Sequence, residues 1–397
     1  MLTDGALRML VLLHFHTLGF SPVQLAYLFV LYEIAGVVTN LSAGWFAARF
    51  GLTTTLYAGL SLQVLALLAL AQLDTSWGIT ASVVFVMLVQ GVSGVAKDLT
   101  KMSSKSAVKT LAPADSGVLF QWVAVLTGSK NAVKGSGFLL GAMLLAVFGF
   151  VSSVLTMAVI LFVILVGVLF YMPSGLPAGR KDAKFSEVFS GNRNINWLSA
   201  SRLFLFGARD VWFVVGVPIY FYAVISDGSD DGNRDAFFLV GTFMAVWTIF
   251  YGIIQGWTPR ILKVTSQTNT EILAQAKWWV GLLIVVPLLL AALVWLVPEP
   301  SRTLTSVIVL GLLVFGGIFA VNSSLHSFLI LSFTDAKRVT MDVGFYYMSN
   351  AAGRLLGTVL SGFTYQVGGL PMCLSAATVM IGLSWIGTSQ LKLQISS

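Results

Sequence analysis

Charged side chains occur inside long apolar stretches of this sequence, where an ion needs a partner, water or a function. Placing one ion in the interior of a membrane costs about 2.5–3.5 kcal/mol on insertion scales. Seven cations and four acids stand in such stretches: Arg8, Lys97, Lys130, Lys134, Arg202, Arg209 and Arg354, with Asp4, Glu33, Asp98 and Asp210. This surplus of cations favours an anionic ligand over a neutral or cationic one.

The spacing of the cations indicates which of them could contact an anion together. A lysine recurs every four residues, which would form one stripe along a helix: Lys97, Lys101, Lys105 and Lys109. Arginine can bind a phosphate-like oxyanion with two donors, and lysine adds a mobile point charge. We therefore predict an oxyanion site built from Arg8, Lys97, Lys130, Lys134, Arg209 and Arg354, with amide contacts from Asn131 and Asn350. The alternatives are a helix end outside the membrane for the stripe and structural ion pairs for Lys134 and Arg354.

The carboxylates are candidates for structural ion pairs or for carrying a proton. Asp4 lies four residues before Arg8, in the order that favours a salt bridge within one helix. Glu33 has no cation within four residues, so it could carry a coupled proton. We predict the same role, with less support, for Asp4, Asp98, Asp210 and His326. The lone Cys373 excludes an internal disulfide framework, and no metal or cofactor site is expected.

The elements that position these residues follow from composition. The chain has 397 residues, of which 57% are hydrophobic and 10% charged. A soluble domain carries about 25% charged residues. This composition excludes a soluble enzyme, a disordered chain and a nucleic-acid binder, and it indicates a polytopic membrane protein in a lipid bilayer. Because the phosphate-binding motif G-x-x-x-x-G-K-[ST] does not occur, we do not expect this chain to drive transport by ATP hydrolysis.

Polar and Gly/Pro breaks divide the chain into twelve apolar segments, and a helix needs roughly 20 residues to cross the hydrocarbon core. The segments are 1–18, 21–47, 52–72, 77–97, 118–148, 150–172, 195–225, 235–258, 277–297, 302–333, 341–367 and 371–391. The sequence therefore predicts an all-α protein with twelve transmembrane helices. The first segment is barely long enough, so we expect either an abbreviated first helix or a true start upstream of Met1.

Loop charges predict the orientation and the division of the chain. Lysine and arginine gather in alternate loops, which the positive-inside rule assigns to the cytoplasm. Both termini are then cytoplasmic. The polar stretch 173–194 follows the sixth segment and is expected to be a cytoplasmic loop between two six-helix halves, 1–172 and 195–397.

The two halves contain a weak internal repeat. SKNAVKGSG from Ser129 and SNAAGRLLG from Ser349 carry serine, alanine, a cation and glycine at the same offsets. A repeat of two six-helix halves is typical of the major facilitator superfamily. That superfamily carries G-x-x-x-D-R-x-G after its second helix, whereas Gly44–Gly51 reads GWFAARFG, with Ala48 in the acidic position. The glycines Gly128, Gly135, Gly137 and Gly141 are interpreted as close helix packing.

Three longer strings are more specific: TDGALRMLVLLHFHTLGFSP from Thr3, SGVAKDLTKMSSKSAVK from Ser93 and FQWVAVLTGSKNAVKGSGFLLG from Phe120. They resemble the organoarsenical efflux permeases of the major facilitator superfamily, the ArsJ type. The resemblance implies export of 1-arseno-3-phosphoglycerate across the bacterial cytoplasmic membrane and arsenate resistance. It also implies functional pairing with glyceraldehyde 3-phosphate dehydrogenase, which makes that compound from arsenate.

The residues and the resemblance together predict a monomeric secondary exporter that works by alternating access, with proton coupling by antiport. The alternatives within transport are a permease for another organic phosphate or anion, or a drug exporter. An intramembrane enzyme using Ser129 or Ser136 with His326 is disfavoured, because no acid is placed to orient the histidine.

Overall fold

The structure, a computed structural model, describes residues 1–50, 52–74, 76–111, 116–172, 190–262, 269–297, 299, 301–334 and 339–392. Within these ranges the description leaves out the side chains of 43–50, 52, 102–111, 116–128, 259, 269, 302, 331 and 339–341. The elements are α1 (Leu2–Thr17), α2 (Pro22–Tyr27), α3 (Val30–Phe50), α4 (Leu52–Leu70), α5 (Ile79–Leu111), α6 (Ser116–Tyr171), α7 (Arg193–Val211), η1 (Trp212–Gly216), α8 (Val217–Ile225), α9 (Asp230–Ile261), α10 (Asn269–Leu296), α11 (Arg302–Phe333) and α12 (Val339–Ser389).

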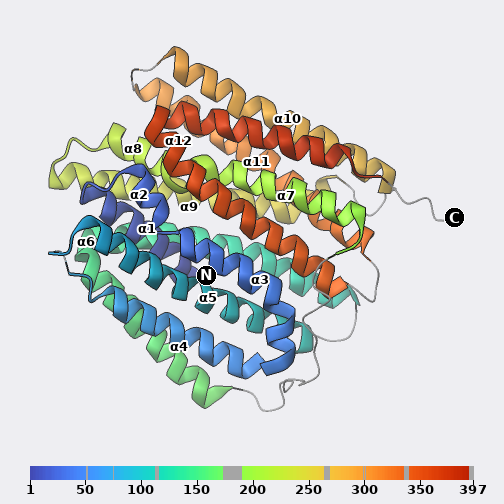
Figure 1. Ribbon diagram of the computed structural model, residues 1–397, viewed down its shortest axis with the longest axis horizontal. Helices are drawn as coiled ribbons and strands as arrows, with labels where there is room; N and C mark the ends of the chain where they lie inside the picture. Colours follow the sequence, from blue (N-terminus) through green and yellow to red (C-terminus); the bar gives the residue numbers. More distant parts are fainter. Residues whose placement is uncertain are drawn as a thin grey trace.

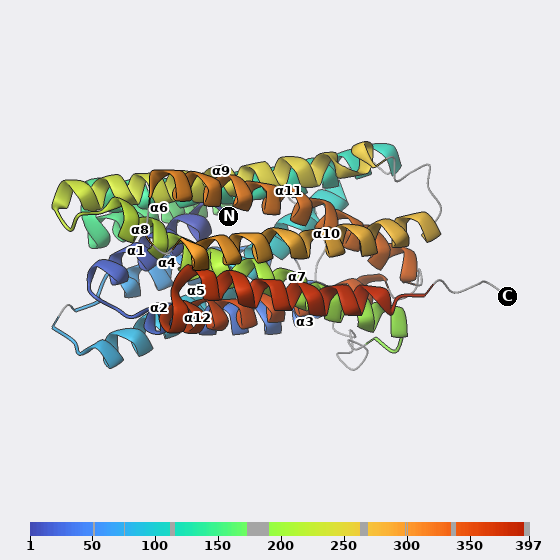
Figure 2. The ribbon, with the colours of Figure 1, turned by 90° about the horizontal axis from the view of Figure 1, so that it is seen from above.

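In the described part of the chain these helices make twelve passes. The passes lie side by side along the long axis of the molecule (Figures 1 and 2). In the described part of the chain, nine helices are long and apolar enough to cross a membrane. Two of the nine, α6 and α12, each contain two passes, and the short α1 supplies one more. The second pass is α2 with α3, and the seventh is α7, η1 and α8. The prediction of an all-α protein with twelve transmembrane helices is confirmed.

The chain reverses inside α6 at Gly149 and inside α12 at Gly368 and Gly369. Gly149 has φ 72° and Gly369 has φ 64°, a left-handed backbone that favours glycine. Figure 1 shows the orange and red runs of α12 passing in opposite directions. Gly149 precedes Gly369 by the same number of residues as Ser129 precedes Ser349, so the reversals fall at equivalent positions of the predicted repeat.

The repeat also appears in the helix packing. A Cβ added to Gly137 would lie 2.2 Å from the Leu2 carbonyl oxygen, which brings the fifth pass against α1. A Cβ added to Gly357 would lie 2.5 Å from the Gly207 carbonyl oxygen, which brings the eleventh pass against α7. Gly141 meets the backbone of Ala6 in the same way. Within the described side chains, the glycine string therefore serves close packing, as predicted.

Two pairs of passes contact each other through polar groups as well as by close packing. The Gln366 side chain of the eleventh pass accepts a hydrogen bond from the Val23 backbone N–H of the second pass at 3.3 Å. Asn131 Nδ2 of the fifth pass donates to Gln255 Oε1 of the eighth at 3.0 Å. The same pairs of passes also pack against each other elsewhere along their lengths.

Candidate functional site

A network of buried ion pairs occupies the centre of the bundle. We define this central network as Arg8 on α1, Glu33 on α3, Arg209 and Asp210 on α7, and Arg354 on α12. Arg354 Nη2 lies 2.7 Å from Glu33 Oε1, and its Nε lies 3.6 Å from Asp210 Oδ2. Arg8 donates to the same oxygen of Glu33, and Arg209 Nη2 lies 2.5 Å from Asp210 Oδ1. The network therefore joins passes from both ends of the sequence.

A second group of charges, on α1, α5 and α6, lies beside this network. Lys134 Nζ lies 3.7 Å from Asp4 Oδ2, and the Tyr32 hydroxyl donates to the Asp4 carboxylate. Lys97 Nζ donates to the Tyr32 oxygen at 2.8 Å and lies over the Tyr32 ring at 4.1 Å from its centroid. Arg8 also lies over this ring, at 5.1 Å. Tyr32 thus touches the second group directly and the central network through Arg8.

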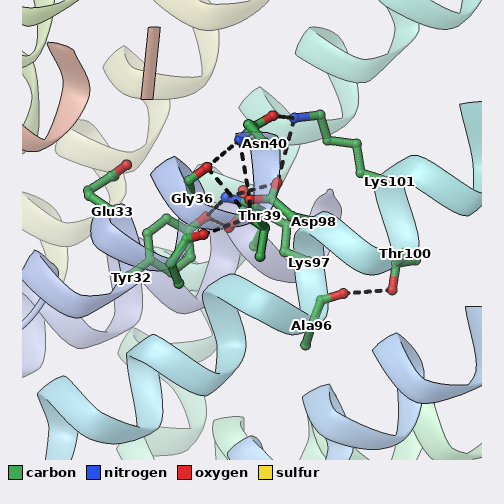
Figure 3. Close-up of polar contacts among 12 residues, drawn as sticks. Tyr32, Glu33, Gly36, Thr39, Asn40, Ala96, Lys97, Asp98, Thr100 and Lys101 are labelled. Atoms are coloured by element: carbon green, nitrogen blue, oxygen red, sulfur yellow. Dashed lines mark hydrogen bonds and ion pairs between the residues drawn. The ribbon is translucent and has the colours of Figure 1, made fainter. Parts of the chain in front are cut away.

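Asp98 on α5 collects a third set of contacts, which Figure 3 shows between α3 and α5. The Thr39 hydroxyl donates to Asp98 Oδ2 at 2.7 Å. Lys97 and Lys101 approach Oδ1 at 3.7 and 3.5 Å, and Lys101 also donates to Asn40 Oδ1 at 3.4 Å. Asp98 is 1% exposed, so its charge is compensated mainly by these two lysines.

Amide and hydroxyl groups connect the fifth pass with the eighth and tenth. Asn131 donates to Gln255, and Gln255 Nε2 donates to Ser323 Oγ at 3.1 Å. The Ser323 backbone oxygen accepts from Arg202 Nη1 at 3.1 Å. The predicted amide residue Asn131 is therefore in contact with the polar interior, although it touches none of the ion pairs directly.

The one pairing expected from spacing is wrong. The structure pairs Asp4 with Lys134 and Arg8 with Glu33, rather than Asp4 with Arg8. Glu33 is not an isolated carboxylate, because two guanidinium groups reach it from other helices. Spacing within one helix cannot reveal partners that come from another helix.

The remaining predicted residues lie at different places around the centre. Lys130 is half-buried on α6, one residue before Asn131. Asn350 lies one helical turn before Arg354, and its Oδ1 is buried without a hydrogen bond among the described residues. His326 is fully buried on α11, outside the central network. The side chains of Lys105 and Lys109, and the Gly44–Gly51 motif apart from the backbone of its helical part, lie outside the description.

Sequence reasoning missed Tyr32, Thr39, Asn40 and Gln255 as members of the site. Tyr32 is adjacent to Glu33, and Thr39 and Asn40 follow on the same helix, so a polar run in an apolar segment was the available signal. Gln255 stands just before Gly256-Trp257 near the end of the eighth pass. Tyr32, Thr39 and Asn40 each contact a charged side chain through a hydroxyl or amide, and Gln255 contacts the neutral Asn131 and Ser323.

The charge balance shows what this arrangement can bind. Four carboxylates share six cations in the three sets of ion pairs: Arg8, Lys97, Lys101, Lys134, Arg209 and Arg354. Glu33, Asp98 and Asp210 each have two cationic neighbours. Two positive charges thus remain without a matching carboxylate. An oxyanion would complete the balance.

Among the described residues no group of three His, Cys, Asp or Glu could hold a metal.

Comparisons with known proteins agree with the architecture. The sequence profile of the Major Facilitator Superfamily matches residues 1–358. No curated protein matches the chain. A POT family transporter in complex with 5-aminolevulinic acid is similar in structure, with TM-score 0.74 and 13% identity over 97% of this chain and 92% of that one.

Two further solved structures are similar over nearly the whole chain. A bacterial homologue of the iron transporter ferroportin, in an inward-facing state, has TM-score 0.68 and 14% identity over 98% of this chain and 96% of that one. A mutant of the nucleoside transporter NupG has TM-score 0.69 and 17% identity over 98% of this chain and 95% of that one. At these identities the likeness extends to the fold alone.

Proposed function

Since this chain belongs to the Major Facilitator Superfamily and is a membrane transporter, we propose that it is a secondary exporter of an organic anion, 1-arseno-3-phosphoglycerate. The observation that carries the anionic substrate is the surplus of cations over carboxylates among the buried ion pairs. The arsenical nature of the substrate and the outward direction of transport are proposed from the three sequence strings that resemble organoarsenical efflux permeases. The halves 1–172 and 195–397 would rock about the central network.

Substrate binding would exploit the two guanidinium groups that converge on Glu33. Arg8 and Arg354 come from α1 and α12, so an oxyanion bound between them would touch both ends of the sequence. Charge-assisted bonds from arginine to phosphate or arsenate oxygens are about twice as strong as neutral ones. The anion would replace Glu33 on these donors. Arg209 in the central network and Lys134 in the second group of charges lie beside them.

Proton coupling belongs to the same proposal, with the buried carboxylates as carriers. Protonation of Glu33 would neutralise a carboxylate that competes with the anion for two arginines. The attraction of the site for an anion would therefore increase. Asp4, Asp98 and Asp210 each touch a cation of the site and are further candidates. Outward movement of a multiply charged anion is also favoured by an inside-negative membrane potential, by about 2.3 kcal/mol per charge at 100 mV.

A permease for another organic phosphate is the alternative that the same cation surplus favours. A drug exporter with neutral or cationic cargo would have no use for that surplus. Competition in everted vesicles separates these possibilities, since 3-phosphoglycerate and other phosphate esters would inhibit uptake by the alternative permease as strongly as the arsenical does.

The substrate assignment is tested in arsenate-sensitive cells. The protein is expressed with and without a glyceraldehyde 3-phosphate dehydrogenase, and resistance and extracellular organoarsenical are measured. We expect resistance and export only when both proteins are present. Resistance without the dehydrogenase, or no export with it, would reject the arsenical substrate.

The same cells test the site. Arg354→Ala and Lys134→Ala should each reduce export by at least about 30-fold, because each removes a charged contact worth roughly 2–5 kcal/mol. Arg193→Ala, an exposed arginine at the start of α7, is the control and should export normally. Protein level in the membrane is measured for each variant, and full export by both site variants would remove these residues from the binding model.

A further inference from the structure

Arg202 on α7 is a buried cation that lies apart from every ion pair described above. It is 3% exposed. Its Nη1 donates to the Ser323 backbone oxygen at 3.1 Å, and its Nε makes no hydrogen bond among the described residues. The guanidinium lies over the rings of Phe206 and Tyr346, at 4.0 and 5.0 Å from their centroids. No carboxylate in the described part of the chain forms an ion pair with it.

His326 on α11 brings a second set of unused donors to this place. It is fully buried and stands one turn after Ser323, whose backbone oxygen accepts from Arg202, and neither of its ring nitrogens makes a hydrogen bond among the described residues. Neutral imidazole always has one N–H donor, so a buried donor is unsatisfied here. One turn earlier, the fully buried Asn322 keeps Oδ1 without a partner, while its Nδ2 donates to the Ile318 oxygen at 3.1 Å.

The donors of this cluster lack the partners that the other buried cations have. Buried polar groups are nearly always hydrogen-bonded, and an unsatisfied one costs about 1–3 kcal/mol. A buried charge without a counter-ion costs more. Arg8, Arg209 and Arg354 avoid this cost because each reaches a carboxylate. Among the described residues, Arg202 reaches a backbone oxygen and two aromatic rings but no carboxylate.

The chemistry of the partner follows from these donors. Guanidinium and imidazole N–H groups are matched by the oxygens of a phosphate or arsenate group. The unused oxygen of Asn322 would suit a hydroxyl of an organic substrate. Arg202 and Arg209 both lie over the Phe206 ring, with centroid distances of 4.0 and 4.9 Å. The cluster is therefore next to the central network, about one side chain away along α7.

We propose that Arg202 and His326 form a second oxyanion subsite, which binds one end of a substrate whose other end lies on the central network. The proposal rests on the anionic substrate of the proposed function and extends it to an anion with two charged ends. It assigns His326 to substrate binding rather than to proton transfer. Tyr346, whose ring lies under the Arg202 guanidinium, is fully buried and belongs to the same hydrophobic cluster as Leu198 and Leu325.

Purified full-length protein in lipid nanodiscs is titrated with sodium arsenate, and separately with sodium phosphate, at ionic strength held constant with sodium chloride. Thermal unfolding is followed at each concentration, because a ligand that binds the folded state raises Tm in a saturable way. We expect a saturable rise for the wild type. Arg202→Gln should weaken the apparent affinity for both ions at least tenfold, and without ligand its Tm should equal or exceed that of the wild type.

The control is Arg193→Gln, which makes the same change at an exposed position of α7 and should behave as the wild type. If Arg202→Gln does not fold, His326→Phe carries the test, since it removes both ring nitrogens and leaves the charge, and it should weaken binding about tenfold. Arg202→Lys should restore part of the affinity, because it restores the charge without the two-donor fork.

Three results would overturn the subsite: no saturable oxyanion effect in the wild type, an unchanged effect in Arg202→Gln and His326→Phe, or a loss of Tm in Arg202→Gln with the oxyanion effect retained. The last result would show a structural role. A normal Arg202-dependent effect in a protein that confers no dehydrogenase-dependent resistance would reject the arsenical substrate alone. Dehydrogenase-dependent export with no Arg202-dependent effect would reject the subsite alone.

Discussion

The Glu33 carboxylate compensates two guanidinium groups that belong to opposite ends of the sequence. Arg8 and Arg354 both donate to its Oε1. An anion that binds to these two arginines must displace Glu33, or must bind when Glu33 is neutral. Of the buried carboxylates, Glu33 is therefore the one whose charge state is most directly tied to anion binding in the proposed mechanism.

Glu33→Gln should uncouple transport from the proton gradient. The substitution keeps the shape of the side chain and removes its charge, which leaves Arg8 without a counter-ion and Arg354 with Asp210 alone. We expect uptake of the organoarsenical into everted vesicles to lose its dependence on an imposed pH gradient. Breaking a buried ion pair costs about 3–5 kcal/mol, so a lower Tm in detergent is also expected.

Glu299→Gln is the matched control, because it is the same substitution at an exposed glutamate outside the bundle. It should retain both the gradient dependence and the Tm. Gradient-driven uptake by Glu33→Gln at the wild-type level would assign the proton to another carboxylate.

The residue types of the site were predictable from the sequence, whereas their pairings were not. Arg8, Lys134 and Arg354 stand out as cations in apolar segments, and the structure places all three in buried ion pairs. Their partners come from other helices: Glu33 is 25 residues from Arg8 and 321 from Arg354. Only the packing of the helices brings them together, and a periodicity within one segment contains no information about it.

At the scale of single elements, small residues decide how closely the passes approach. Lipid tails are as apolar as leucine, so burial of apolar surface does little to hold one transmembrane helix on another. A Cβ on Gly141 would lie 2.2 Å from the Ala6 carbonyl oxygen, whereas a Cβ on Gly167 would meet nothing within 4 Å. Both glycines belong to α6.

Gly141→Ala should therefore destabilise the protein, while Gly167→Ala should not. The first change forces the fifth pass away from α1 and shifts Lys134 relative to Asp4. We expect a loss of about 1–3 kcal/mol from overpacking, seen as a lower Tm of the purified protein and weaker export. Equal Tm values for the two variants would contradict the close-packing role.

The seventh pass shows where sequence reasoning stops at this scale. The apolar segment 195–225 predicts one helix, and the structure places a π-helical turn, η1, within it. The Ser361 hydroxyl accepts hydrogen bonds from the backbone N–H groups of Val215 and Gly216 at 3.1 and 3.2 Å. A serine on another pass stabilises this turn, so the hydropathy of the segment itself could not reveal it. The turn begins two residues after Asp210, next to the central network.

At the scale of the whole molecule, the contact of Val23 with Gln366 joins the second and eleventh passes near one end of the bundle. Alternating access requires the contacts between the two halves at one end to open while those at the other end stay closed.

A disulfide across one end should stop transport. Val23→Cys with Gln366→Cys joins the second and eleventh passes at exposed positions. We expect oxidation to abolish export and reduction to restore it, whereas each single-cysteine variant should be insensitive to oxidation. The native Cys373 is fully buried, so it does not compete for the cross-link. Export by the oxidised double variant at the wild-type rate would show that this contact stays closed throughout the cycle.

The two glycine reversals leave almost no loop between the passes that they join. At Gly149 and Gly369 one pass ends and the next begins almost at once, with no connecting segment that could accommodate an inserted epitope or admit a protease. An accessibility experiment that reports the sidedness of the protein should therefore place its label elsewhere. The exposed turn around Gly228, which has φ 85° and no neighbour within 4 Å of an added Cβ, is a suitable position.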